Sequence, residues 1–264
     1  HLIEYINNTP NWKEALLEEP FNLKSIEESP THPNYWMFVY NLYNSDFTNP
    51  MLKACRGTVL EIVDNKVVGV VCHAMDKFFN YGDPNCDKID WNTVEIIDKK
   101  DGQLIKVSRY KNEVLWFTNG AFGLNTPLSY TDDKIKDYET LVKVALGENI
   151  TWIDRIPEGM TVFMELCSPY NRIVCKYDEI KMWLLGARDA NQKEIPPEDL
   201  NIPLESPEIY RNISGILGPD LEDSFDGVKK LLTYFNWKTQ EGVVIRDDQF
   251  NRVKMKCEDY VRIH

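Results

Sequence analysis

The chain has 264 residues, of which 43% are hydrophobic and 27% are charged, and its formal net charge is −12. This length allows one large domain or two small ones that fold without metal or disulfides, whereas the acidic balance argues against a surface that binds nucleic acid over its whole extent. The six cysteines form no Cys-x-x-Cys pair, and neither a signal peptide nor an apolar run of membrane-spanning length is visible, so we expect a reduced, monomeric, cytoplasmic protein without a membrane partner.

The predicted elements alternate between short strands and a few helices. The first helix has Thr9 as its N-cap and Pro10 in its first turn, and it ends by Pro20. Apolar spacing predicts later helices over residues 134–146 and 227–235. β-rich runs predict strands over residues 36–40, 58–63, 67–72, 94–98, 104–108, 114–117, 161–166, 180–185, 242–246 and 252–256. The pattern predicts one mainly antiparallel α+β domain over residues 1–264, in which residues 1–34 precede the part that carries the motifs.

A run of four residues between two predicted strands carries the first chemical signal. Lys99-Lys100-Asp101-Gly102 fits the pattern Lys-x-Asp-Gly, and we expect the Lys99 amine on a tight turn at a sheet edge. A neutral amine there can attack the α-phosphorus of a nucleoside triphosphate and hold the nucleotide as a phosphoramide. The pattern alone is weak, because a chain of this length contains it by chance about three times in a hundred.

Carboxylates and lysines on other predicted strands strengthen this signal. Glu165 interrupts an apolar strand, where it either faces solvent or needs a partner or a metal ion. Glu241 begins a strand, and Lys254 and Lys256 share one face of the last strand because side chains alternate. A basic cluster around Lys99 consists of Lys99, Lys100, Lys106, Arg109 and Lys111. A late segment gathers acid at Asp220, Glu222, Asp223 and Asp226. The asymmetry favours a phosphate-binding cleft on an acidic body, or else a solvated charge run.

Together these parts resemble the covalent nucleotidyltransferase superfamily of polynucleotide ligases and capping enzymes. Residues 54–57 (Ala-Cys-Arg-Gly) and 76–80 (Asp-Lys-Phe-Phe-Asn) resemble segments that precede the nucleophile in the phage T4 RNA ligase 1 family and that capping enzymes lack. Further matches to that family are residues 165–174, residues 181–185, Glu241-Gly242, residues 254–256 and Tyr260. The resemblance covers roughly residues 35 to 261 in order.

The resemblance implies an ATP-dependent RNA ligase built on an antiparallel-sheet nucleotidyltransferase domain, ATP-grasp-like and flanked by helices. Lys99 would attack the α-phosphorus of ATP, AMP would pass to an RNA 5′-phosphate, and a 3′-hydroxyl would displace AMP to seal the strand. The implied cofactors are ATP and Mg²⁺ or Mn²⁺. The implied partner is single-stranded or broken-loop RNA, in RNA repair such as tRNA repair.

The resemblance also implies roles for individual residues. Lys254 and Lys256 would join Lys99 as catalytic residues by holding the α-phosphate while negative charge develops. Glu165 and Glu241 would bind the metal ion, partly through water, since Mg²⁺ keeps much of its hydration shell. Cations around Lys99 would favour its neutral, attacking form.

Further residues are implied to contact the nucleotide or the RNA. Asp101 would either join the metal site or position the nucleophile. Asn171 and Arg172 would contact nucleic acid, although Arg172 could instead form a structural ion pair. Tyr40 would lie near the nucleotide, or else it is a buried aromatic residue of its strand. The implied nucleotide-binding set, besides the residues named above, is Tyr40, Arg56, Lys77, Phe79, Asp101 and Gly102.

Two positions depart from the family pattern, and other functions stay open. Gln103 stands where the family often has serine, and Asn119 where a lysine is expected, which would alter phosphate or nucleic-acid contacts. We also expect the family's helical C-terminal domain to be absent from this chain. The alternatives are a DNA ligase or a capping-type guanylyltransferase with the same lysine chemistry, or a catalytically idle nucleic-acid-binding domain.

Overall fold

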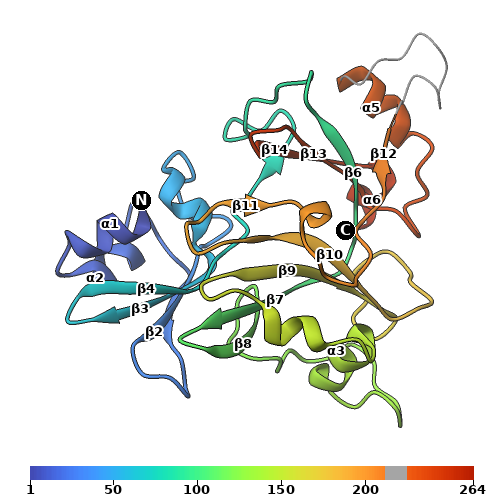
Figure 1. Ribbon diagram of the computed structural model, residues 1–264. Coiled ribbons are helices and arrows are strands. Elements are labelled where there is room, and N and C mark those ends of the chain that lie inside the picture. The colour runs from blue at the N-terminus through green and yellow to red at the C-terminus, as the bar shows by residue number, and fades with distance from the viewer. Residues whose placement is uncertain (212–224) are drawn as a thin grey trace.

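The computed structural model describes residues 1–211 and 225–264. Most of its regular structure is strand, arranged in three sheets with helices packed on the outside (Figure 1). All strand pairs are antiparallel except the pair of β14 and β5. The predicted mainly antiparallel α+β class is therefore confirmed. In the described part of the chain, no helix has both the length and the apolar character needed to cross a membrane.

The N-terminal sheet has four strands in the order β1-β2-β3-β4. Two short helices cover it, with Ile6 and Leu16 packed against Phe38 and Leu60. Burying these apolar side chains stabilises helices that are too short to persist alone. The elements are α1 (Leu2–Asn7), α2 (Trp12–Leu17), β1 (Ser25–Glu28), β2 (Tyr35–Val39), the 3₁₀ turn Pro50–Ala54, β3 (Arg56–Val63) and β4 (Lys66–Cys72).

The predicted N-cap at Thr9 is wrong. Helix α1 ends at Asn7, and α2 begins at Trp12 after the N-cap Asn11. The Thr9 carbonyl instead accepts a backbone hydrogen bond from Trp12, at 3.0 Å. Thr9 and Pro10 therefore form the turn between two helices, the first of which the sequence pattern did not predict.

The central sheet has the strand order β11-β10-β9-β7-β8. Helix α3 packs Tyr138 and Leu141 against Ile105 and Val162 of this sheet. The helix begins later than the predicted residue 134, because the Asp137 carboxylate caps it by accepting a hydrogen bond from the Thr140 amide at 2.7 Å. The elements are β7 (Gln103–Tyr110), β8 (Glu113–Thr118), α3 (Tyr138–Leu146), the 3₁₀ turn Thr151–Arg155, β9 (Thr161–Cys167), β10 (Lys181–Arg188), β11 (Glu194–Ile195) and the 3₁₀ turn Pro197–Asp199.

The C-terminal sheet has the order β12-β6-β13-β14-β5. Val228 and Leu231 of α5 pack against Ile96 and Val243 of this sheet. Its elements are β5 (Phe79–Asn80), β6 (Glu95–Lys99), β12 (Ile209–Tyr210), α5 (Phe225–Leu232), β13 (Gly242–Arg246), β14 (Arg252–Lys256) and α6 (Glu258–Ile263). The acidic positions Asp220, Glu222 and Asp223 lie outside the described residues.

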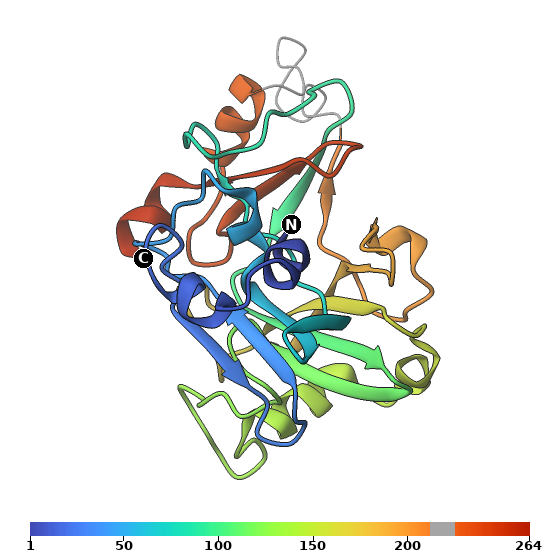
Figure 2. The ribbon, with the colours of Figure 1, turned by 90° about the vertical axis from the view of Figure 1, so that its left-hand side faces the viewer.

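The chain crosses from the C-terminal sheet to the central sheet directly after Lys99. Only residues 100–102 separate β6 from β7, and the two sheets lie one above the other in both views (Figures 1 and 2). Lys99 is the last residue of β6, an interior strand between β12 and β13. The expectation of a tight turn at a sheet edge is therefore wrong, and the nucleophile candidate sits where two sheets meet.

Candidate active site

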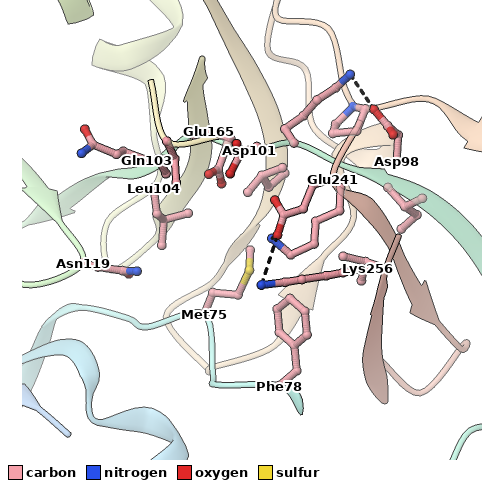
Figure 3. Close-up of a pocket in the computed structure, with 18 of the residues that line it drawn as sticks. Met75, Phe78, Asp98, Asp101, Gln103, Leu104, Asn119, Glu165, Glu241 and Lys256 are labelled. Atoms are coloured by element: carbon pink, nitrogen blue, oxygen red, sulfur yellow. Dashed lines mark ion pairs between the residues drawn. The ribbon is translucent and has the colours of Figure 1, made fainter. Parts of the chain in front are cut away.

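A cavity of about 430 Å³ opens between the central and C-terminal sheets (Figure 3). Side chains from both sheets and from the crossover line it. They include Arg56, Lys99, Gln103, Asn119, Tyr138, Glu165, Glu241 and Lys256. The cavity therefore brings together Lys99, Glu165, Glu241 and Lys256 from distant parts of the sequence. The predicted catalytic residue Lys254 does not line it and lies in a neighbouring cavity, which Lys256 also lines.

Strand register explains why two amines share one carboxylate. Gly242 of β13 pairs with Lys99 of β6 on one side and with Lys256 of β14 on the other. Glu241 precedes this glycine, so its side chain lies between both lysines. Its Oε1 is 2.9 Å from the Lys99 Nζ and 3.5 Å from the Lys256 Nζ. The Glu241 side chain is 3% exposed, which strengthens both attractions by excluding water.

Lys100, beside the candidate nucleophile, also lines the cavity but pairs with a different carboxylate. Its Nζ lies 2.6 Å from Asp98 Oδ2 and 4.1 Å from the centre of the Trp183 ring. Successive strand residues point to opposite faces, so Lys99 and Lys100 diverge at the end of β6. Lys99 is thus the amine of this pair that joins Glu241 and Lys256.

Unneutralised positive charge gathers beside this ion pair. Burial, followed by the charges of Lys99 and Lys256, lowers the pKa of Lys254 to about 7. Burial, followed by the Arg56 charge, also lowers the pKa of Lys77. Cations that disfavour one another in this way are stabilised by an anion, and several phosphate groups would supply that charge.

Aromatic rings hold Lys77 in this cationic cluster. The Lys77 Nζ lies 5.3 Å from the centre of the Tyr40 ring, 5.4 Å from that of Phe47 and 4.9 Å from that of Phe79. Such contacts attract a cation to the faces of the rings. The structure thus brings Tyr40, Lys77 and Phe79 together, as the sequence motifs predicted, and adds Phe47, which those motifs did not indicate.

Glu165 of β9 lines the cavity rather than facing open solvent. Burial is the main cause that raises the pKa of its carboxyl to about 7, and the charges of Lys99 and Arg56 oppose this rise. The Gly102 amide donates a hydrogen bond to it. The carboxylate is therefore only partly compensated, and a cation that entered the cavity would be attracted to it.

Asp101, a predicted metal ligand, accepts hydrogen bonds with both of its carboxylate oxygens. Its Oδ2 accepts hydrogen bonds from the amides of Val174 and Cys175, at 2.9 and 2.7 Å, and its Oδ1 accepts one from the Tyr260 hydroxyl at 2.7 Å. The residue is 4% exposed. Through these three hydrogen bonds Asp101 ties the crossover to α6, and its ligation of a metal ion stays a prediction.

A preformed metal site of three or more His, Cys, Asp or Glu side chains is not found among residues 1–211 and 225–264. Glu165 and Glu241 are the other two predicted ligands, and both line the cavity. Mg²⁺ is commonly held by one or two carboxylates together with water and substrate phosphates. The partly compensated Glu165 carboxylate fits such a role, with Glu241 beside it.

The predicted nucleic-acid residues fall into two different environments. Asn171 is 5% exposed, donates from Nδ2 to the Leu166 carbonyl at 2.9 Å and accepts a hydrogen bond from Ser168. These contacts hold Asn171 in place within the protein, and its contact with nucleic acid stays a prediction. Arg172 is exposed and donates from Nε to the Val174 carbonyl at 3.1 Å. It forms no ion pair with the described residues, so the structural ion-pair alternative is wrong and its RNA contact stays a prediction.

Sequence reasoning missed one residue of the site and the burial of one lysine that does not line it. Tyr138 falls within the predicted helix over residues 134–146 and was not predicted to belong to the site, yet it lines the cavity from the first position of α3. Lys106 was counted as part of a basic cluster, but it is fully buried and donates from Nζ to the Gly57 carbonyl at 2.9 Å. A lysine between the apolar Ile105 and Val107 was the available signal for this burial.

Comparison with known proteins adds an independent line of evidence. A protein-family model described as RNA ligase, of the T4 RNA ligase 1 type, matches residues 54–260. A protein of Autographa californica nuclear polyhedrosis virus, provisionally named a bifunctional polynucleotide kinase/RNA ligase, is 27% identical in an alignment 164 residues long that covers 57% of this chain and 23% of that protein.

Two solved structures, described as forms 1 and 2 of an archaeal ATP-dependent RNA ligase, share the fold. Each has a TM-score of 0.50 and 14% identity, over 75% of this chain and 51% of its own. The matched region thus spans less than two thirds of the length of these relatives.

Proposed function

Because the chain belongs to the T4 RNA ligase 1 family of RNA ligases, we propose that it seals RNA ends with ATP through AMP held covalently on Lys99. The observation that carries this proposal is the single buried Glu241 carboxylate between the amines of Lys99 and Lys256, all three of which line one cavity. An ATP-grasp-like nucleotidyltransferase domain is the architecture that we infer for it.

In the first proposed step, Lys99 attacks the α-phosphorus of ATP. The amine loses its proton, the new N–P bond forms, and the bond from the α-phosphorus to the bridging oxygen breaks as pyrophosphate leaves. Lys256 and Lys254 stabilise the charge that develops on the α-phosphate. Arg56 and Lys77 orient the leaving pyrophosphate, because phosphoryl transfer depends mainly on alignment and charge stabilisation.

The next two proposed steps use the same alignment. An RNA 5′-phosphate oxygen attacks the phosphorus of lysyl-AMP, the P–N bond breaks, and Lys99 regains its amine. A 3′-hydroxyl then attacks the RNA 5′-phosphorus, and AMP leaves as the phosphodiester bond forms. Holding the two ends in place makes this last attack effectively unimolecular. Arg172, exposed near the cavity rim residue Ile173, would contact the RNA backbone.

Glu165 and Glu241 would hold a Mg²⁺ or Mn²⁺ ion. When bound, the ion would offset negative charge on the substrate phosphates. The partly compensated charge of Glu165 supports this assignment. Broken single strands or loops, including cleaved tRNA, are the substrates that we infer for a repair role.

Strand sealing with labelled RNA tests this function. A single-stranded RNA with a labelled 5′-phosphate and a 3′-hydroxyl is incubated with ATP and Mg²⁺, and the label should become resistant to phosphatase. Lys99→Met should abolish sealing, whereas Lys143→Met, on an exposed lysine of α3, should leave it unchanged. Activity with GTP only, or on nicked duplex DNA only, would support capping or DNA-ligase chemistry instead. RNA binding without covalent chemistry would support the idle domain.

A further inference from the structure

Three buried polar atoms in the cavity have no hydrogen-bond partner among residues 1–211 and 225–264. They are Gln103 Oε1, Asn119 Oδ1 and the Tyr138 hydroxyl. All three residues line the same cavity as Lys99. Tyr138 is 1% exposed. Leaving a buried polar atom unpaired costs about 1 to 3 kcal/mol, so three in one cavity indicate groups that are satisfied by a ligand.

Two of these residues, Gln103 and Asn119, lie on the side of the cavity away from Lys256 (Figure 3). Gln103 begins β7, Asn119 follows the end of β8, and Tyr138 begins α3, so all three come from the central sheet and its helix. Figure 3 shows Gln103 and Asn119 on one side of Glu165, with Glu241 and Lys256 on the other. The cavity therefore has a cationic end and an end rich in hydrogen-bond acceptors.

The chemistry of the acceptor end decides what it can bind. Amide oxygens only accept hydrogen bonds, so Gln103 Oε1 and Asn119 Oδ1 repel phosphate oxygens and require an O–H or N–H donor. The Tyr138 hydroxyl both donates and accepts. Vicinal sugar hydroxyls match this set, because each of them can donate to one group and accept from another.

We propose that Gln103, Asn119 and Tyr138 form a ribose-hydroxyl subsite that makes the enzyme prefer ribonucleotides over deoxyribonucleotides. The inference rests on the proposed function, because it assumes a nucleotide whose phosphate lies against Lys99 and Lys256. The ribose belongs either to ATP or to the 3′-terminal nucleotide of the RNA. At two of these positions the T4-type pattern has serine and lysine, and a lysine there would attract phosphate instead of accepting from hydroxyls.

The first arm of the test uses ATP alone. Formation of the protein–AMP adduct is measured with ATP, 2′-deoxy-ATP and 3′-deoxy-ATP for the wild type and for Asn119→Leu, Gln103→Met and Tyr138→Phe, which remove the polar atoms with little change of volume. If the ribose of ATP is bound, the wild type prefers ATP by about tenfold or more, and the variants lose most of that preference.

The second arm uses RNA acceptors that end in a ribose or in a 2′-deoxyribose. If the terminal ribose of the RNA is bound, discrimination appears only in sealing, and the same variants lower it. Trp152→Phe is the matched control, because the Trp152 indole N–H is also buried and unpartnered in the described structure but does not line the cavity. It should leave both ratios unchanged.

Two results would overturn the inference. One is unchanged ratios in all three variants in both arms, as expected if water alone satisfies these atoms. The other is a loss of discrimination between ATP and ITP with hydroxyl discrimination intact, which would assign the atoms to the base. Equilibrium binding of ATP and 2′-deoxy-ATP to Lys99→Met tests the subsite without any covalent step. Absence of protein–AMP in the wild type would therefore reject the proposed function and leave the subsite to be judged by this binding measurement.

Discussion

At the scale of single residues, Glu241 would set the starting state of the proposed lysine chemistry. Its carboxylate lies 2.9 Å from the Lys99 amine, so the amine is held in an ion pair before ATP arrives. Lys256, 3.5 Å from the same oxygen, can keep Glu241 paired when Lys99 turns to the α-phosphorus. The second lysine thereby lowers the cost of releasing the first, because the buried carboxylate is not left uncompensated.

Glu165 provides a prediction about pH and stability. Burial raises the pKa of its carboxyl from 4.5 to about 7. The folded state therefore favours the neutral form of Glu165. Its contribution to the unfolding free energy is fully present below the unfolded pKa and is lost as the pH rises through about 7. Glu165→Gln keeps a neutral side chain, so relative to wild type it should gain about 1 to 3 kcal/mol in unfolding free energy between pH 5 and pH 8.

Urea unfolding of both proteins at pH 5 and pH 8 measures this difference. The titration of Lys254, whose pKa is about 7, has the opposite sign, because a depressed lysine adds stability as the pH rises above its folded pKa. To a first approximation it is present in both proteins and cancels in the comparison. A stability difference that stays constant from pH 5 to pH 8 would show that the native Glu165 carboxyl is not shifted.

At the scale of elements, the crossover between β6 and β7 depends on close backbone packing. A Cβ atom on Gly102 would lie 2.2 Å from the Leu166 carbonyl oxygen of β9, whereas a Cβ on Gly120, which lines the same cavity, would meet nothing within 4 Å. A backbone atom cannot move aside as a flexible side chain can. Gly102 therefore lets the crossover that follows Lys99 pass close to β9.

Alanine at these two glycines gives a matched comparison. Gly102→Ala should lower the unfolding free energy by about 2 kcal/mol or more, by forcing strained backbone shifts, and it should slow protein–AMP formation. Gly120→Ala should change stability by less than about 1 kcal/mol. Thermal unfolding and adduct formation are measured for both. Equal stabilities would mean that the crossover tolerates displacement from β9.

Elements with strong local patterns could be predicted from the sequence, and weakly patterned ones could not. Runs of β-branched residues, such as residues 242–246, gave strands close to their observed bounds. Helix α1, strand β1 and helix α6 carry short or mixed patterns and were missed. Their apolar residues, such as Ile6 and Tyr260, are satisfied by distant parts of the chain, and local periodicity cannot report such contacts.

At the scale of the whole molecule, the site forms where distant strands pair. The motifs predicted that Lys99, Glu165, Glu241 and Lys256 belong together, and the cavity contains all four. They could not predict that Glu241 lies between the two lysines, since this follows from the pairing of β13 with both β6 and β14. For the same reason the sequence could not predict the hydrogen bond that Asp101 accepts from Tyr260, which lies 159 residues further along the chain.

The charge of the whole chain limits how RNA can bind. With a net charge of −12, we expect the cationic residues of the cavity to be the part of the described structure that attracts an RNA backbone. We expect weak binding of single-stranded RNA that falls about tenfold between 50 and 200 mM salt, as when two or three phosphates are neutralised. Fluorescence anisotropy with labelled RNA measures it. A tight complex that is insensitive to salt would require a different RNA surface.

The central claim is that Lys99 carries AMP, and α-labelled ATP tests it most directly. The protein is mixed with α-labelled ATP and Mg²⁺, denatured, and examined for label that is labile in acid and stable in base, as a phosphoramide is. Mass spectrometry first checks that the protein does not already carry AMP. The account predicts label from ATP in the wild type and in Lys143→Met, and none in Lys99→Ala. Label that persists in Lys99→Ala, or no label in any protein, would contradict it.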